Sequence, residues 1–245
     1  MQTVSIFGCG WVGKALAKEL EPNYKINCLV KSQSSLKSLD FKNCYLSQNK
    51  EFLNCHTLVI AIPPRGDYLD TLKSLLKQTK TSTFVILLSS TSIYQQTSGT
   101  LSEESSKNID TPNLMLQAER LVKSISKNTT TLRLGGLMGY NRVAGKYTQG
   151  STKANDRYVN YIHRDDIVDI IKLIIAKKIE SKTYNVVAPL HPKESQIYAK
   201  NAKKFNLQAT NYKSSKIVGK IVSSNLLQKE LNYQFLKPNP LEFWD

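Results

Sequence analysis

A glycine motif near the amino terminus constrains the fold of this chain more than any other feature. Gly8, Gly10 and Gly13 are spaced as GxGxxG, after the apolar run Thr3–Phe7 and at the start of the helical pattern Trp11–Leu20. Here Gly8 is expected to make a tight turn, Gly10 to let a pyrophosphate approach the backbone, and Gly13 to let the helix pack on the strand. A glycine turn without a ligand is the alternative. The motif predicts a dinucleotide site with contacts from Gly8, Gly10, Trp11, Val12 and Gly13.

Strand-like and helix-like runs alternate along most of the chain. The apolar, strand-like runs are Thr3–Phe7, Tyr24–Val30, Cys44–Leu46, Thr57–Ile62, Thr83–Leu88, Thr130–Leu134 and Thr183–Val187. The runs with helical spacing are Trp11–Leu20, Asp67–Gln78, Pro112–Ser124 and Asp165–Lys177. This alternation predicts the α/β class, with a doubly wound parallel sheet of the Rossmann type that binds ligands at the carboxyl ends of its strands. The polar, glycine-rich stretch 137–160 is expected to be a mobile excursion over the substrate side.

Net charge and apolar run length limit the partners of the chain. Its 245 residues include 34 Lys and Arg against 19 Asp and Glu, a formal net charge of +15. The excess is mostly lysine scattered along the chain, which is typical of a solvated surface and makes nucleic-acid binding a minor alternative. Apolar runs are too short to cross a bilayer, so no membrane partner is expected.

The cysteines and histidines show no metal-binding pattern. Cys9, Cys28, Cys44 and Cys55 include no CxxC pair, and the chain begins without a signal-peptide pattern. We therefore expect free thiols in a reducing cytoplasm. His56 and His191 have no carboxylate or cysteine at ligand spacing, so no metal is predicted.

The residues after the second strand bear on the choice of dinucleotide. An NAD enzyme usually ends this strand with an acid that holds the ribose 2′-hydroxyl. This chain continues with Lys31 and Ser32 and has no acid before Asp40. A lysine and hydroxyl groups suit a 2′-phosphate, so NADP is preferred over NAD. The alternative is that Lys31 is simply one of many exposed lysines.

The later strand ends carry the remaining candidate site residues. Ser90 and Thr91, at the end of the fifth strand, lie where this fold places reacting chemistry, although they could simply cap the next turn. Tyr94 could supply a proton to the substrate or be packed with its hydroxyl bonded internally. Further cofactor contacts are expected from Ala61, Ile62, Pro63, Ser89 and Leu137.

An ordered set of motifs gives the chain a family resemblance. The motifs are the glycine loop, Ser89-Ser90-Thr91-Ser92-Ile93-Tyr94, Ser102-Glu103-Glu104, Leu132-Arg133-Leu134-Gly135-Gly136-Leu137-Met138-Gly139, Tyr161-Ile162-His163-Arg164-Asp165-Asp166-Ile167, Tyr184-Asn185-Val186-Val187 and Glu230-Leu231-Asn232-Tyr233. In this order and spacing the chain resembles the extended short-chain dehydrogenases/reductases, also called the NAD-dependent epimerase/dehydratase family, in their short atypical branch. The resemblance implies a Rossmann domain at 1–136 and 160–188, and a small, largely carboxy-terminal substrate lobe at 137–159 and 189–245.

The resemblance also implies a catalytic layout, from which this chain departs. A Ser or Thr at Ser90 would hydrogen-bond the reacting oxygen, and a Tyr-x-x-x-Lys pair would supply the proton. Counting back from the matching Glu119 places that pair at Thr111 and Met115, so the usual pair is absent. The arginine that holds the diphosphate of sugar nucleotides falls at Val159, where Arg157 is a nearby substitute.

These expectations combine into one preferred function and one rival. The preferred function is NADP(H)-dependent hydride transfer to or from a hydroxyl or carbonyl of a small polar substrate, sugar nucleotides included. Net redox chemistry and epimerisation through a keto intermediate both remain open. The rival is a non-catalytic NADP(H)-binding sensor or regulatory protein. The resemblance further implies a possible homodimer through Asp67–Gln78 and Pro112–Ser124.

Overall fold

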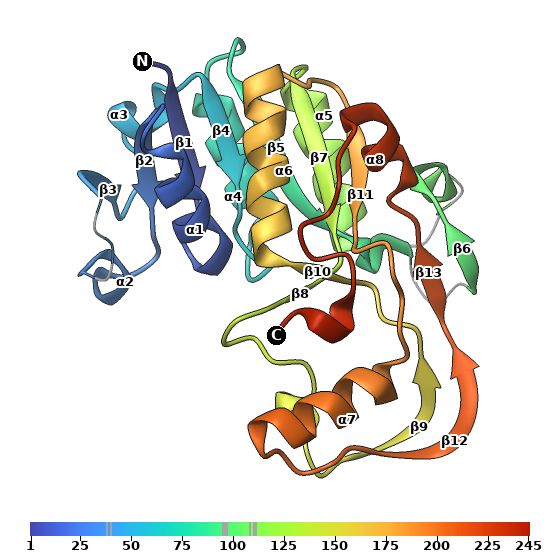
Figure 1. Ribbon diagram of the computed structural model, residues 1–245. Helices are drawn as coiled ribbons and strands as arrows, with labels where there is room; N and C mark the ends of the chain where they lie inside the picture. Colours follow the sequence, from blue (N-terminus) through green and yellow to red (C-terminus); the bar gives the residue numbers. More distant parts are fainter. Residues whose placement is uncertain (38, 40, 95–97, 108, 110–111) are drawn as a thin grey trace. The chain divides into compact units, whose positions relative to one another are not determined.

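The computed structural model describes residues 1–245 except 38, 40, 95–97, 108 and 110–111. Its main element is a seven-stranded parallel sheet in the order β11–β7–β5–β4–β1–β2–β3 (Figure 1). The strands are β1 Thr3–Phe7, β2 Lys25–Leu29, β3 Asn43–Tyr45, β4 Thr57–Ile60, β5 Phe84–Ser90, β7 Thr129–Leu134 and β11 Thr183–Val186. All seven predicted strands are present, and the predicted Rossmann fold is confirmed.

Helices cover both faces of this sheet. In Figure 1, α1 and α6 lie on one face, and α4 and α5 lie on the other. The helices beside the sheet are α1 Trp11–Leu20, α2 Gln33–Lys37, α3 Lys50–Leu53, α4 Tyr68–Gln78, α5 Leu114–Ile125 and α6 Arg164–Lys177. Asn113 determines where α5 begins, because its side chain accepts hydrogen bonds from the N–H groups of Met115 and Leu116.

The chain divides into two compact units. The first unit comprises Met1–Ile93, Asp110–Arg133 and Val168–Thr183, and the second comprises Tyr94–Ile109, Leu134–Ile167 and Tyr184–Asp245. The predicted substrate lobe, 137–159 and 189–245, lies wholly within the second unit.

Among its described residues, the second unit contains short strand pairs and two complete α-helices. The strand pairs join β6 Gly99–Leu101 to β13 Lys220–Val222, β8 Gly136–Met138 to β10 Tyr161–His163, and β9 Thr152–Arg157 to β12 Asn211–Val218. The helices are α7 Glu194–Phe205 and α8 Asn225–Leu231. The stretch 137–160, expected to be a mobile excursion, contains β9 and all of β8 except Gly136, because both strands pair with segments that lie later in the sequence.

Apolar packing and one buried carboxylate organise the second unit. Its core cluster consists of Ala144, Val159, Tyr161, Ala188, Ile197, Tyr198 and Phe243. Asp166 is fully buried and accepts hydrogen bonds from the Tyr233 hydroxyl and from the backbone N–H groups of Leu236 and Lys237. These bonds fasten the carboxy-terminal segment to the first turn of α6.

Candidate functional site

The glycine motif forms a turn that larger side chains could not adopt. Gly8 has a φ of 108°, and a Cβ there would lie 2.9 Å from the Ala61 backbone. A Cβ on Gly13 would overlap the carbonyl oxygen of Gly8, so α1 packs against the turn only with glycine at this place. A Cβ on Gly10 would meet nothing within 4 Å. The first and third glycines are therefore needed for the turn itself, whereas Gly10 faces open space.

The amino terminus of α1 suits an anionic ligand. In α1, which is described throughout, no side chain caps the first turn and none of its first-turn residues is acidic. The positive end of the helix dipole and the space at Gly10 therefore coincide. The predicted contacts Trp11 and Val12 lie in this turn, Trp11 partly exposed and Val12 buried. The residues present fit a dinucleotide pyrophosphate.

The ends of β2 and β4 border the glycine turn. The N–H groups of Gly8 and Cys9 both donate to the Leu29 carbonyl at the end of β2. Ala61 donates from its N–H to the Phe7 carbonyl, and a Cβ on Gly8 would touch Ile62. The structure thus brings the predicted contacts Ala61 and Ile62 beside the turn, while the predicted contact Pro63 is exposed.

Lys31 and Ser32 follow β2 and are exposed. The Ser32 hydroxyl lies 3.0 Å from that of Ser34 and 2.9 Å from that of Ser35. A basic residue therefore directly precedes a cluster of hydroxyl groups in the chain. Asp40, the first acid after β2, lies outside the described residues.

The end of β5 holds one serine in the interior and one at the edge. The Ser89 hydroxyl is buried and donates to Glu119 Oε1 at 2.5 Å, so this predicted cofactor contact bonds a carboxylate inside the first unit. The Ser90 hydroxyl is half-buried and accepts a hydrogen bond from the Ser92 N–H at 3.1 Å. That bond orients the Ser90 oxygen and leaves its own proton available for donation. Thr91 follows, buried, in a short 3-10 helix.

Tyr94 ends that 3-10 helix and is only 1% exposed. Its hydroxyl donates to Asn185 Oδ1 at 2.6 Å. Lys220 donates from its Nζ to the Tyr94 carbonyl and lies 5.9 Å from the centre of the tyrosine ring. The phenol is therefore held inside the second unit by a strong internal hydrogen bond. Met115, at the position where the resemblance places a lysine, is buried in α5, and Thr111 lies outside the described residues.

A pocket in the second unit lies beside the predicted contact Leu137. Its volume is about 340 Å³, and its lining includes Leu137, Met138, Arg142 and Tyr147. Burial lowers the pKa of Arg142, which stays a cation at neutral pH because its ordinary value is so high. Sequence reasoning missed Arg142, since an arginine in an irregular stretch carries no periodic signal.

Arg157, the nearby substitute for a diphosphate-binding arginine, pairs with a buried carboxylate. Its guanidinium donates to Glu194 Oε1 at 2.6 Å, and Lys153 donates to Oε2 of the same residue at 2.6 Å. Burial alone would raise the pKa of Glu194, but the hydrogen bonds and charges of Lys153 and Arg157 outweigh burial and lower it. Val159 is buried in the core, so it offers no charge to a ligand.

The expectation of free thiols was wrong for two of the four cysteines. Cys9, in the glycine loop, and Cys28, on β2, form a disulfide, whereas Cys44 and Cys55 are free. The parallel pairing of β1 and β2 brings the two bonded residues together. The spacing of the cysteines in the sequence does not predict this disulfide.

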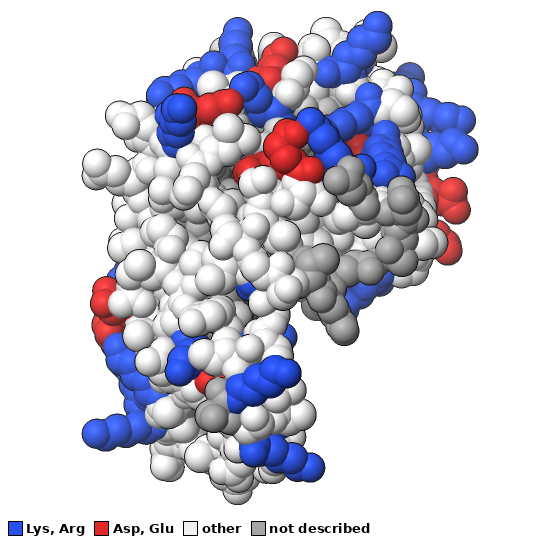
Figure 2. All heavy atoms as spheres, turned by 90° about the vertical axis from the view of Figure 1, so that its right-hand side faces the viewer, with Lys and Arg blue, Asp and Glu red and all other residues white. Residues whose placement is uncertain are grey.

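The described residues contain neither a helix suited to span a membrane nor a cluster suited to hold a metal ion. Among them, no helix combines the length and apolar character that crossing a membrane requires. Within the same residues, no cluster of three or more His, Cys, Asp or Glu side chains is placed to hold a metal ion. On the face drawn in Figure 2, Lys and Arg stand in several separate groups, some with Asp and Glu among them.

The strand order and the glycine turn define an α/β protein with a Rossmann fold. The chain has the fold of NAD-dependent epimerase/dehydratase and short-chain dehydrogenase/reductase structures, as the sequence motifs predicted. No protein-family model matches it.

Individual relatives cover nearly the whole chain. It is 26% identical to Protein YeeZ of Escherichia coli K12 over 269 aligned positions, which cover 98% of each chain. A putative NAD-dependent epimerase/dehydratase from Methylobacillus flagellatus aligns with a TM-score of 0.79 at 22% identity, covering 99% of this chain and 96% of that one. MoeE5 in complex with UDP-glucose and NAD aligns with a TM-score of 0.76 at 16% identity, covering 98% and 96%.

Proposed function

We propose that this chain binds a nicotinamide dinucleotide at its glycine turn and catalyses hydride transfer to or from a hydroxyl or carbonyl of a small polar substrate. The observation that carries the proposal is the turn itself. Gly8 and Gly13 fit where a Cβ would collide, while Gly10 leaves open space at the amino terminus of α1. When bound, the dinucleotide supplies the hydride donor or acceptor.

The residues after β2 favour NADP(H) over NAD(H). Lys31 is exposed and directly precedes the clustered hydroxyls of Ser32, Ser34 and Ser35 in the chain. A cation with several hydroxyl donors stabilises a phosphate dianion, whereas an acid at this place would repel it. Residues 30–39 contain no acid to receive a ribose 2′-hydroxyl.

Ser90 is proposed to orient the reacting oxygen. Its Oγ is fixed by the Ser92 N–H and retains a proton that can be donated to a carbonyl or hydroxyl of the substrate. Thr91 stays a predicted catalytic residue, and Tyr94 and water are the two predicted sources of the proton. Because the Tyr94 phenol is bonded to Asn185, we propose that the proton travels through water rather than from this phenol.

Sugar nucleotides are the first substrate class to test. MoeE5, which shares the fold, is described in complex with UDP-glucose and with UDP-glucuronic acid. In this chain, Arg142 in the second-unit pocket supplies a cation suited to an anionic substrate.

Calorimetric titration with NADP, NADPH, NAD and NADH, each separately, tests the proposal. Wild-type protein is expected to bind NADPH and NADP in preference to NAD and NADH. Gly10→Ala is the most informative variant, because its methyl group would contact no protein atom within 4 Å but would fill the space proposed for phosphate. It should unfold at the wild-type temperature and lose at least about 1.4 kcal/mol, a factor of ten, in NADPH affinity. Folded wild-type protein that binds none of the four would refute the proposal.

A second candidate, the non-catalytic sensor, has its own support. The phenol of Tyr94 is internally bonded, and apolar Met115 stands in place of the usual lysine. A sensor would bind the dinucleotide without turnover of any alcohol, ketone or sugar nucleotide. A substrate screen that follows both cofactor absorbance and, by chromatography, product formation distinguishes the two, because epimerisation returns the hydride and leaves the absorbance unchanged.

A further inference from the structure

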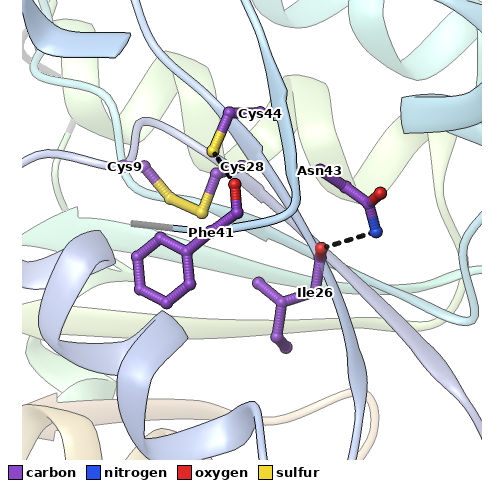
Figure 3. Close-up of a disulfide and its surroundings, with 6 residues drawn as sticks. All are labelled: Cys9, Ile26, Cys28, Phe41, Asn43 and Cys44. Carbon is purple, nitrogen blue, oxygen red and sulfur yellow. Dashed lines mark hydrogen bonds between the residues drawn. A yellow bond between two sulfur atoms is a disulfide. The ribbon is translucent and has the colours of Figure 1, made fainter. Parts of the chain in front are cut away.

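Three of the four cysteines come together beside the glycine turn. Cys9 stands between Gly8 and Gly10 and is bonded to Cys28 on β2, with 5.6 Å between their Cα atoms. Cys44 on β3 is the register partner of Cys28 in the parallel pair β2–β3. Figure 3 shows the Cys44 thiol beside the Cys9–Cys28 bridge.

Cys28 is therefore within bonding reach of two cysteines. Register partners on neighbouring strands lie about 4.8 Å apart and direct their side chains to the same face of the sheet. Disulfides form between Cα atoms about 4.4–6.8 Å apart, a range that includes the 5.6 Å of Cys9–Cys28 and the spacing of about 4.8 Å expected for the register partners Cys28 and Cys44. One sulfur can thus exchange between two partners without rearrangement of the sheet.

We propose that Cys9, Cys28 and Cys44 form a thiol–disulfide exchange site that sets the affinity of the glycine turn for its dinucleotide. In the exchange, the Cys44 thiolate attacks Cys28 Sγ, the Cys9–Cys28 bond breaks, and a Cys28–Cys44 bond forms. Cys9 leaves as a thiolate and takes up the proton that Cys44 released, so the step involves no net oxidation.

A low-molecular-weight disulfide, such as oxidised glutathione, connects this site to the fully reduced state. A protein thiolate attacks it to give a mixed disulfide and one glutathione thiol. A second cysteine then displaces the other glutathione, and two protein thiols have been oxidised as one disulfide was reduced. Cys44 is the entry point, because it is half-buried whereas Cys9 and Cys28 are 4% and 0% exposed. Burial raises the pKa of the Cys44 thiol, so its thiolate is scarce and exchange is slow.

The link to the dinucleotide is the backbone of the turn, and this part of the proposal rests on the proposed function. Gly8 and Cys9 already donate to the Leu29 carbonyl, next to Cys28 in the chain. The Cys9–Cys28 bond fixes the same loop covalently to β2. Exchange to Cys28–Cys44 removes this covalent link, so the loop becomes less ordered. Ordering it again then reduces the free energy of ligand binding. The Cys9–Cys28 form is expected to bind NADPH about five-fold or more tightly than the reduced form.

Peptide mapping tests the exchange directly, because trypsin separates the four cysteines. They fall on the peptides 1–14, 26–31, 43–50 and 51–65. Wild-type protein is incubated to equilibrium in glutathione buffers of graded redox ratio, quenched with acid and alkylating agent, and digested without reductant. We expect both cross-linked pairs, 1–14 with 26–31 and 26–31 with 43–50. Cys44→Ser should give only the first pair, and the control Cys55→Ala should give both. A wild-type protein that forms only the first pair at every redox ratio overturns the exchange.

NADPH affinity, measured on oxidised and reduced Cys44→Ser protein, tests the coupling. This variant can form only Cys9–Cys28, so its two states differ in that bond alone. A difference of about five-fold or more in favour of the oxidised state supports the proposal, and equal affinities overturn it. If no state of any variant binds a dinucleotide, the proposed function fails, while the peptide pairs still decide whether exchange occurs.

Discussion

Glu119 on α5 and Arg133 on β7 form an ion pair inside the first unit, with the Arg133 Nη2 atom 2.8 Å from Glu119 Oε2. Their side chains are 2% and 5% exposed, and Arg133 Nε also donates to the same carboxylate. Ser89 donates to Glu119 Oε1 from the end of β5. One buried carboxylate thus connects α5 to two strands of the sheet. It lies near the end of β5, where Ser90 is proposed to orient the reacting oxygen.

Removing that carboxylate should destabilise the protein. Glu119→Ala leaves the guanidinium of Arg133 buried without its partner, which typically costs about 3–5 kcal/mol. Arg120→Ala, at the next position and exposed, is the matched control and should change stability by less than about 0.5 kcal/mol. Urea unfolding followed by circular dichroism measures both. Equal midpoints for the two variants would contradict a structural role for the pair.

Replacing Lys31 should change cofactor preference. Lys31→Ala is expected to weaken NADPH binding by about 1.5–3 kcal/mol, the usual loss of a charge-assisted hydrogen bond, and to leave NADH binding unchanged. Lys37→Ala, an exposed lysine in α2, is the control. Calorimetry with both cofactors on both variants gives the result. If Lys31→Ala weakens neither cofactor, some other group must determine the preference.

The serine at the end of β5 should affect turnover without affecting cofactor affinity. Once a substrate is known, Ser90→Ala is expected to lower kcat/KM about 100-fold. Ser92→Ala, an exposed hydroxyl two residues on, is the control and should stay within about five-fold, or 1 kcal/mol, of wild type.

Tyr94→Phe separates the two proton routes. If water delivers the proton, this variant retains kcat within about five-fold and loses about 1 kcal/mol of stability with its bond to Asn185. A 100-fold or larger loss of kcat with NADPH affinity unchanged would instead make Tyr94 the proton donor. Steady-state rates and thermal unfolding of the same preparations supply both readouts.

Stability should fall as the pH drops below about 6.5. Burial lowers the pKa values of His163 and His191, so both favour the neutral form in the folded protein. The unfolded chain then binds more protons than the folded one between the lowered and ordinary pKa values. Stability is fully present above the ordinary value and is lost through that window as pH falls, by up to about 1.4 kcal/mol per pH unit for each histidine.

His163→Gln tests the contribution of one of these groups. It should flatten the dependence of the unfolding free energy on pH between about pH 7 and 5.5, above the range where ordinary carboxyl groups titrate. The exposed His56 provides the control His56→Gln. Urea unfolding at a series of pH values shows whether only the first variant loses the slope.

Local sequence signals were sufficient to predict the sheet, the glycine turn and the helices α1, α4, α5 and α6 that cover the sheet. Each depends on local information: apolar runs predict the strands, a 3.6-residue period predicts the helices, and glycine spacing predicts the turn. The predicted α1, Trp11–Leu20, has the same bounds in the structure, and α4 and α6 each begin within one residue of the predicted start. The strand pairs of the second unit carried no such signal. The sequences of β9 and β12 are polar and lack a regular strand period, and these segments become strands by pairing with each other.

Which side chains meet could be seen only in the folded chain. Cys9 reaches Cys28 across 19 residues because β1 and β2 pair in parallel. Tyr94 reaches Asn185 across 91 residues, and Ser89 reaches Glu119 across 30. Such contacts are set by strand order, register and burial, which are properties of the folded chain rather than of any short segment. The sequence therefore indicated where a site should lie, and only the fold decided which candidate hydroxyls and thiols are already bonded elsewhere.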